Sequence, residues 1–245
     1  MFRKGRYRAR EAETPADIGA AQRLRHLAFH GDVTGAGVDA DAFDAICTHV
    51  LIEEVASGRL VCCFRVLPLS DGAEIGRSYS AQFYGLASLG AFAGPMAEMG
   101  RFCIHPQARD PDIPRVARAA MTRFVDENRI GMLFGCSSFK GTDAALYADA
   151  FAMLSARHLA PRRWWPRIKA PSVVRFAQRW RRRPPDARRA MLGTPPLLRS
   201  YLAMGGWVSD HAVIDRQMNT LHVFTGLEIA AIPATRQRLL RAAAS

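Results

Sequence analysis

The 245-residue sequence predicts an α+β fold in which one mixed, mostly antiparallel sheet is flanked by helices. A helix and a hairpin near the N-terminus are followed by a strand–helix–strand–helix order, which implies at least one parallel crossover. Two further strands return near the C-terminus. Hydrophobic residues make up 49% of the chain, which is enough to build one sizeable core.

Cap and turn signals place the first elements. Thr14 precedes Pro15, the order of a helix cap and a proline at the first helical position, and apolar residues then recur at helical spacing. Residues 15–30 are therefore predicted to be helical. The apolar runs 47–55 and 59–67 flank an Ala-Ser-Gly turn and predict a β-hairpin.

The rest of the chain continues with apolar runs of strand length alternating with helical patterns. The predicted elements are a central strand at 96–104, a helix at 113–129, a buried strand at 131–139, a helix at 143–157, strands at 206–214 and 219–227, and a terminal helix from near Pro233. We expect one folded domain over 14–230, preceded by a basic tail at 1–13 and followed by a helix or tail at 231–245.

The net charge of +12 is concentrated in two segments. Residues 161–190 hold eleven Arg or Lys against one Asp, and the first ten residues hold five more basic residues and no acid. Subtracting the +10 and +5 of these segments leaves the other residues at −3, so the main body of the protein is not strongly basic. We interpret the proline- and arginine-rich residues 161–196 as a basic insertion.

Several classes of protein are excluded by composition. No apolar run is long enough for a membrane-spanning helix, and the basic N-terminus lacks the apolar stretch of a secretory signal. The five cysteines are odd in number and form no CxxC pair, which predicts a reduced, cytoplasmic protein without a metal site.

Eight polar and aromatic residues form an ordered set of spaced motifs. They are Arg25 and Phe29 (RxxxF) on the first helix, Asp41 and Asp44 (DxxD) just beyond it, Arg65 in FRVLP, and Glu98, Arg101 and Phe102 (ExxRF) on the central strand. This set resembles the motif of acyl-homoserine lactone synthases, which use acyl carrier protein as donor. That family also carries a tryptophan soon after the first motif, whereas this chain has none before Trp164.

Two longer stretches are similar to the bacterial N-acyltransferases that make lyso-ornithine lipid. They are residues 96–143, which include EMGRFCIHPQARDP and GCSSFKGTD, and residues 195–216, which begin with PPLLRSYL. This resemblance covers about residues 15–230. It implies an N-acetyltransferase-like (GNAT) fold and transfer of a 3-hydroxyacyl group from acyl carrier protein to the α-amine of ornithine, with acyl carrier protein as co-substrate and no bound cofactor.

Three alternatives to this interpretation stay open. The first is the same reaction on another amino acid, glutamine for example, since the sequence does not select the acceptor. A homoserine lactone synthase would consume S-adenosylmethionine. A module of the same fold without turnover would bind only membrane or carrier protein.

The segment before the 113–129 helix favours a carrier-borne donor. Acetyltransferases hold the coenzyme A pyrophosphate at a glycine-rich turn that opens a helix. The equivalent residues 107–118 contain no glycine, and Asp110 and Asp112 would repel a pyrophosphate. Arg115 and Arg118 are candidates for docking an acidic carrier protein, or else ordinary solvated helix residues.

Acyl transfer to an amine requires a base and an oxyanion site. Glu98 is the candidate that accepts the ammonium proton, directly or through one water. A bulge at Gly100 would bring Arg101 to the same side, and the alternative is a structural ion pair between Glu98 and Arg101. Donors for the oxyanion are backbone amides near Phe102 or the hydroxyls of Ser137 and Ser138, unless these serines only pack. We expect direct transfer without a covalent intermediate.

The acceptor carries groups that the motif residues match. Arg25 or Arg65 would bind its carboxylate. Asp41 or Asp44 would hold the side-chain ammonium of ornithine, or alternatively would only cap a short helix. Phe29 and Phe102 belong to the same motifs and are further candidates for substrate binding.

The basic insertion predicts a membrane-facing helix over 172–183. Phe176 and Trp180 would lie on its apolar face, and Arg175 and Arg179 on the basic face. With Trp164 and Trp165 upstream, this pattern is typical of helices that lie at an anionic membrane surface. We therefore expect peripheral association with the inner membrane. The same arginines would also suit an acidic carrier protein, whereas no nucleic-acid-binding fold is recognisable.

Overall fold

The computed structural model describes residues 2–31 and 37–244. Its internal contacts separate two compact units, which we describe one at a time. Unit 1 comprises Met1–Pro68, Met99–Ile130 and Ala234–Ser245, and unit 2 comprises Leu69–Glu98 and Gly131–Pro233. The boundary crosses the expected 14–230 domain, because the chain passes between the units several times.

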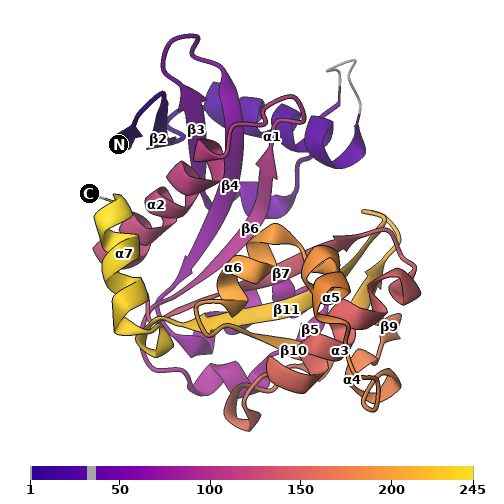
Figure 1. Cartoon of the computed structure of the whole chain (residues 1–245). Helices are drawn as coiled ribbons and strands as arrows, with labels where there is room; N and C mark the ends of the chain where they lie inside the picture. Colours follow the sequence, from indigo (N-terminus) through magenta and orange to yellow (C-terminus); the bar gives the residue numbers. More distant parts are fainter. Residues whose placement is uncertain (1, 32–36, 245) are drawn as a thin grey trace. The chain divides into compact units, whose positions relative to one another are not determined.

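Unit 1 contains strands in the order β1-β2-β3-β4-β6, and β1 to β4 pair antiparallel (Figure 1). The bounds are β1 Phe2–Lys4, β2 Tyr7–Glu11, β3 Thr48–Glu54, β4 Leu60–Leu69, and the second part of β6 Met96–Ile104. The helices are α1 Pro15–His30, the short η1 Ala42–Ala45, α2 Asp112–Glu127, and α7 Ala234–Ala244, which lies beside α2. The predicted first helix and β-hairpin are confirmed.

Residues 2–11 are not the basic tail that the sequence suggested. They form β1 and β2, and along β2 the buried Tyr7 and Ala9, each 3% exposed, alternate with more exposed residues. The intervening arginines are paired with acids: Arg8 and Arg10 bind Glu53 on the neighbouring strand at 2.7 and 2.8 Å, and Arg10 also binds Asp17 at 2.6 Å. Charge alone therefore misled the prediction, and the period-two pattern carried the structural signal.

Unit 2 contains strands in the order β6-β7-β11-β10-β9. The first residues of β6 pair parallel with β7, with α2 between them in sequence, so the predicted parallel crossover is confirmed. The strand bounds are β7 Met132–Lys140, β9 Val173–Val174, β10 Trp207–Asp215 and β11 Thr220–Glu228, and β5 Tyr84–Gly85 pairs with β8 Arg167–Ile168.

Helices of unit 2 pack against this sheet. Figure 1 shows α3, α5 and α6 over one face of β7, β11 and β10, and the apolar core between them includes Phe139, Phe151, Leu198 and Val223. The bounds are α3 Ala148–Arg157, α4 Phe176–Arg179, α5 Ala187–Gly193 and α6 Pro196–Leu202, with short η2 Gly72–Arg77, η3 Ser80–Gln82, η4 Ala87–Ala91, η5 Ala144–Tyr147, η6 Arg162–Trp164 and η7 Ile229–Ala231.

The amphipathic helix expected over 172–183 is wrong. This segment forms the short strand β9 and the single turn α4. Phe176 has no exposed surface, and its ring stacks on Phe151 at 4.9 Å, while Trp180 stacks on the same ring at 5.6 Å. The apolar face therefore belongs to the core of unit 2, because two aromatic rings gain more by stacking on α3 than by remaining at the surface.

We expect Phe176→Ala to lower the free energy of unfolding by about 3–4 kcal/mol, because it removes a fully buried ring from a packed core. Chemical denaturation of the purified protein measures this change. Leu239→Ala in α7 is the control, since this side chain is 69% exposed and its loss should cost less than about 0.5 kcal/mol. Equal effects of both substitutions would contradict the buried position of Phe176.

Candidate active site

A network of charged side chains lies inside unit 1. It consists of three arginines and three aspartates from separate parts of the chain: Arg25 on α1, Asp39, Asp41 and Asp44 before and within η1, Arg65 on β4, and Arg101 on β6. Five of these six residues are motif residues that the sequence singled out. The structure therefore brings together RxxxF, DxxD, FRVLP and the arginine of ExxRF.

Asp44 is the centre of this network. Its carboxylate accepts hydrogen bonds from the Arg25 guanidinium at 2.7 and 2.8 Å and from Arg65 at 2.6 Å. The Gln22 amide adds a further bond at 2.9 Å. Burial alone would raise the pKa of Asp44, but the bonds from Arg25 and Gln22 outweigh it and hold this pKa well below its usual range.

Asp41 and Arg101 form the accessible edge of the network. Asp41 accepts bonds from Arg65 at 2.5 and 2.8 Å and from Arg101 at 3.1 Å. Burial opposes ionisation of Asp41, yet the Arg65 bonds lower its pKa. The side chains of Asp41 and Arg101 are 24% and 15% exposed, whereas Arg25 and Arg65 are 1% and 4% exposed.

The two aspartates also cap η1, which was the alternative interpretation of DxxD. The backbone N–H of Phe43 donates to Asp41 at 2.9 Å, and the N–H of Asp41 donates to Asp44 at 3.3 Å. Capping uses one carboxylate oxygen of each residue and leaves other lone pairs for the arginines. Asp41 and Asp44 thus both cap η1 and bind the arginines of the network.

The central strand is irregular at Arg101 rather than at Gly100. Arg101 has φ +54°, a left-handed conformation that is rare for a residue with a side chain and costs on the order of 1 kcal/mol. Its guanidinium lies 3.2 Å from Asp39 and reaches Asp41. Ion pairing within the network offsets the backbone cost and fixes the direction of this side chain.

Glu98 lies in unit 2, where it is 5% exposed. Its carboxylate accepts the backbone N–H groups of Tyr79 and Ser80, both at 2.7 Å, and the Ser80 hydroxyl at 2.5 Å. Three donors fix the carboxylate and, in turn, the start of η3. No sequence signal linked Glu98 to Tyr79 and Ser80, because the contact depends on a loop 18 residues earlier.

Ser80 extends this group of side chains to β7. Its hydroxyl lies 3.4 Å from the Cys136 thiol, next to Ser137. Ser137 is 9% exposed and accepts a bond from Thr225 at 2.9 Å, whereas Ser138 is exposed. Ser137 is therefore engaged in sheet packing, and Ser138 is the more accessible hydroxyl.

The two aromatic motif residues contribute to packing in unit 1. Phe29 is partly buried against the core that contains Leu24 and Leu51. Phe102 stacks on Phe64 at 6.1 Å. Three further polar residues of unit 1 were missed by the sequence: Gln22, Asp39 and His49, whose ring contacts the Asp44 carbonyl at 3.0 Å. The run of aspartates before η1 was the signal that could have indicated Asp39.

The residues proposed for docking and for membrane contact differ in exposure. Arg115 and Arg118 are exposed on α2, and Arg115 pairs with Asp112 at 2.7 Å. Trp164 packs edge-on against Phe92 at 5.6 Å. The backbone carbonyl of Trp165 accepts the Ser88 hydroxyl at 3.0 Å, and both tryptophans are half-buried in unit 2.

Comparison with known proteins gives a consistent result. A family model described as an acetyltransferase (GNAT) domain matches residues 24–118. The chain is 32% identical to an L-ornithine N(alpha)-acyltransferase of Rhodobacter capsulatus, over 92% of this chain and 91% of the relative. It is 29% identical to the enzyme with the same name from Rhizobium meliloti, over 91% and 80% of the two chains.

A solved acyl-homoserine lactone synthase, BjaI with bound SAM and isopentyl-CoA, is 14% identical to this chain over 93% of this chain and 82% of the other, with a TM-score of 0.48. The expected GNAT-like α+β fold is confirmed by the family match and by the mixed, mostly antiparallel pairing in the two units.

We expect Asp44→Asn to lower the free energy of unfolding by about 3 kcal/mol, because it leaves Arg25 and Arg65 buried with one carboxylate fewer. The pH dependence of the free energy of unfolding should change as well. The pKa of Asp44 is lower in the folded state, so its ionised form stabilises the protein fully above about pH 4, and this contribution is lost as the pH falls.

Denaturant titrations between pH 2 and 7 measure both effects. The wild type should lose stability more steeply below pH 4 than the Asp44→Asn variant. Parallel curves for the two proteins would contradict the central role of Asp44.

Proposed function

The chain belongs to the L-ornithine Nα-acyltransferase family and is an acyltransferase, and we propose that it transfers a 3-hydroxy fatty acyl group from acyl carrier protein to the α-amine of ornithine. The product would be lyso-ornithine lipid, so the enzyme would act in lipid biosynthesis. The observation that carries this proposal is the 32% identity over nine-tenths of both chains. The charged network of unit 1 supports it, because it contains a carboxylate and a guanidinium that would bind the charged groups of an amino-acid acceptor.

Ornithine carries a carboxylate and a side-chain ammonium, and both have partners at the accessible edge of the network. Asp41 would hold the ammonium, since its carboxylate is the most exposed of the aspartates that bind these arginines. Arg101 would bind the carboxylate. Arg25 and Arg65 were further candidates, but their guanidinium groups already bind Asp44 and are almost fully enclosed. Their role would be to hold Asp41 and the η1 turn in place.

The amine must lose a proton before it attacks the thioester carbonyl. Glu98 would accept this proton, directly or through one water, and it precedes Arg101 by three residues on β6. The amine nitrogen then attacks the carbonyl carbon and the carbon–sulfur bond breaks. The second proton of the nitrogen passes to the departing sulfur, so the carrier leaves as a thiol, and Glu98 releases the first proton to solvent. Amides near Phe102 or the exposed Ser138 hydroxyl would stabilise the oxyanion.

Acyl carrier protein as donor agrees with the start of α2. Pro111 precedes this helix, and no glycine lies in 107–118. Asp112 lies in the first turn of the helix, and Asp110 lies two residues before it. An acidic carrier protein would meet the exposed Arg115 and Arg118 on the following turn.

The described residues contain no helix that could cross a membrane. We propose that the protein acts in the cytoplasm and associates with the inner membrane through the basic insertion, where a lipid product would be released. Phe176 and Trp180 do not take part, because both rings are packed on Phe151. The exposed arginines, among them Arg175 and Arg179, support this association.

The direct test supplies the purified protein with 3-hydroxyacyl carrier protein and ornithine, glutamine or lysine, and identifies the product by mass spectrometry. We expect Nα-acyl ornithine as the main product. Asp41→Asn should raise the KM for ornithine about tenfold or more, and should have little effect on 2-aminopentanoate, which lacks the side-chain ammonium. Acylation of glutamine in preference to ornithine would reject the proposed acceptor.

We expect Glu98→Gln to lower kcat by a factor of about 100 or more, because an amide cannot accept the proton. Ser80→Ala is the matched control: it removes one of the three donors to Glu98 and leaves the carboxylate in place. Its kcat should fall less than about tenfold. Thermal unfolding of both variants separates folding from catalysis, and equal losses of kcat in the two variants would assign Glu98 a structural role only.

A further inference from the structure

Unit 2 contains a cleft of about 640 Å³ that takes no part in the proposed chemistry. It lies among η5, the start of α3, the segment after α4, and α5. Its lining includes three arginines, one tryptophan and two leucines: Arg179, Arg183, Arg189, Trp180, Leu146 and Leu192.

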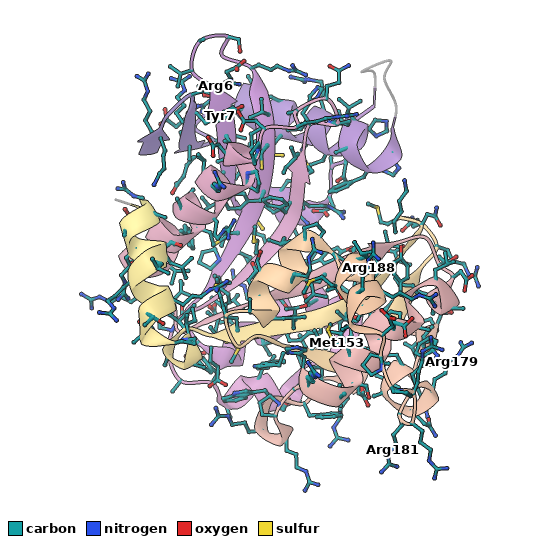
Figure 2. All side chains as sticks on the ribbon, in the orientation of Figure 1. Arg6, Tyr7, Met153, Arg179, Arg181 and Arg188 are labelled. Atoms are coloured by element: carbon teal, nitrogen blue, oxygen red, sulfur yellow. The ribbon has the colours of Figure 1, made fainter. Side chains whose placement is uncertain are left out.

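The charge around the cleft is strongly positive. Residues 175–189 contain seven arginines and a single acid, Asp186. All seven arginines are exposed, whereas Asp186 caps α5 by accepting the backbone N–H of Arg189 at 2.8 Å. Within the cleft, Asp149 pairs with Arg183 at 3.0 Å and accepts the backbone N–H of Asp186 at 3.2 Å. The segment thus has an excess of positive charge directed to solvent, and Figure 2 shows Arg179 and Arg181 extending away from the ribbon.

Trp180, which lines the cleft, is part of an aromatic stack. The Trp180 ring is held parallel to Phe151, with an angle of 8° between the rings. The guanidinium of Arg179 lies over the Trp180 ring, 4.8 Å from the centroid of that ring. A cation–π contact of this kind limits the positions of the guanidinium and keeps it at the mouth of the cleft.

Large apolar side chains are exposed on η5 and α5, two of the elements that line the cleft, and we call them its rim. Leu146 and Leu192 are 74% and 73% exposed, and Met191 is 56% exposed. These are three of the seven large hydrophobic side chains that are exposed in the described chain, and they come from two elements, η5 and α5. Exposed leucines next to arginines match the two layers of a bilayer surface, where phosphates lie outside the acyl chains.

We propose that this cleft and its rim form the site at which the protein contacts an anionic lipid bilayer. Arg179, Arg183 and Arg189 bind lipid phosphates, and Leu146, Met191 and Leu192 enter the acyl boundary. The inference rests on the membrane association proposed above, and it replaces the aromatic face expected from the sequence with aliphatic side chains of η5 and α5.

Point substitutions test the site, because deleting the insertion would also remove Phe176 from the core. One variant combines Arg179→Gln with Arg189→Gln, and a second combines Leu146→Ser with Leu192→Ser. The matched control combines Arg236→Gln with Leu239→Ser, which are exposed positions on α7 of unit 1. Co-sedimentation with vesicles of phosphatidylglycerol, or of phosphatidylcholine alone, measures binding.

Each cation near an anionic surface contributes roughly a fivefold gain in partitioning, so we expect the arginine variant to bind phosphatidylglycerol vesicles about 25-fold more weakly. The leucine variant should bind about tenfold more weakly, and its loss should persist in high salt, where the charge contribution is screened. The control should bind like the wild type. All four proteins should retain acyl transfer from carrier protein in a vesicle-free assay.

Three results would overturn the proposal. If the wild-type protein does not bind phosphatidylglycerol vesicles, the membrane association itself is rejected, whereas the assignment as an acyltransferase is unaffected. Unchanged vesicle binding by both cleft variants would reject this site alone. Unchanged vesicle binding with a raised KM for acyl carrier protein would assign the cleft to the carrier protein.

Discussion

Unit 1 depends on the requirement that buried charges be paired. Asp44 accepts bonds from Arg25 and Arg65, and these contacts join α1, η1 and β4 at one point. A guanidinium that is almost fully enclosed is tolerated only where carboxylates and carbonyls satisfy its donors. Asp41 in turn binds Arg65, Arg101 binds Asp41, and both of these outer side chains remain partly accessible.

Strand β6 carries polar groups with different tasks in its two parts. Glu98 holds the turn at Tyr79 and Ser80 in unit 2, while Arg101 joins the network of unit 1. The left-handed backbone at Arg101 makes a regular strand alternation impossible at this position. Spacing along an ideal strand is therefore a poor guide to where these two side chains point.

The basic insertion separates its charges from its aromatic rings. Phe176 and Trp180 stack on Phe151 and secure the segment to α3, which leaves the arginines at the surface. Aromatic side chains near arginines are thus insufficient to indicate a membrane-facing surface. The exposed leucines of η5 and α5 are a better indication, because nearly three-quarters of each side chain is open to solvent.

The sequence by itself determined most elements and five of the six members of the charged network. Caps, turns and apolar periods located α1, β3, β4, β6, α2 and β7 within a few residues, since these signals act over one or two turns of chain. The ordered motifs likewise identified Arg25, Asp41, Asp44, Arg65 and Arg101 as one group. Only the tertiary structure decided that residues 2–11 join a sheet, that Ser80 binds Glu98, and that Phe176 is buried. Each of these contacts joins residues that are distant in sequence, and such pairings depend on packing that no local pattern encodes.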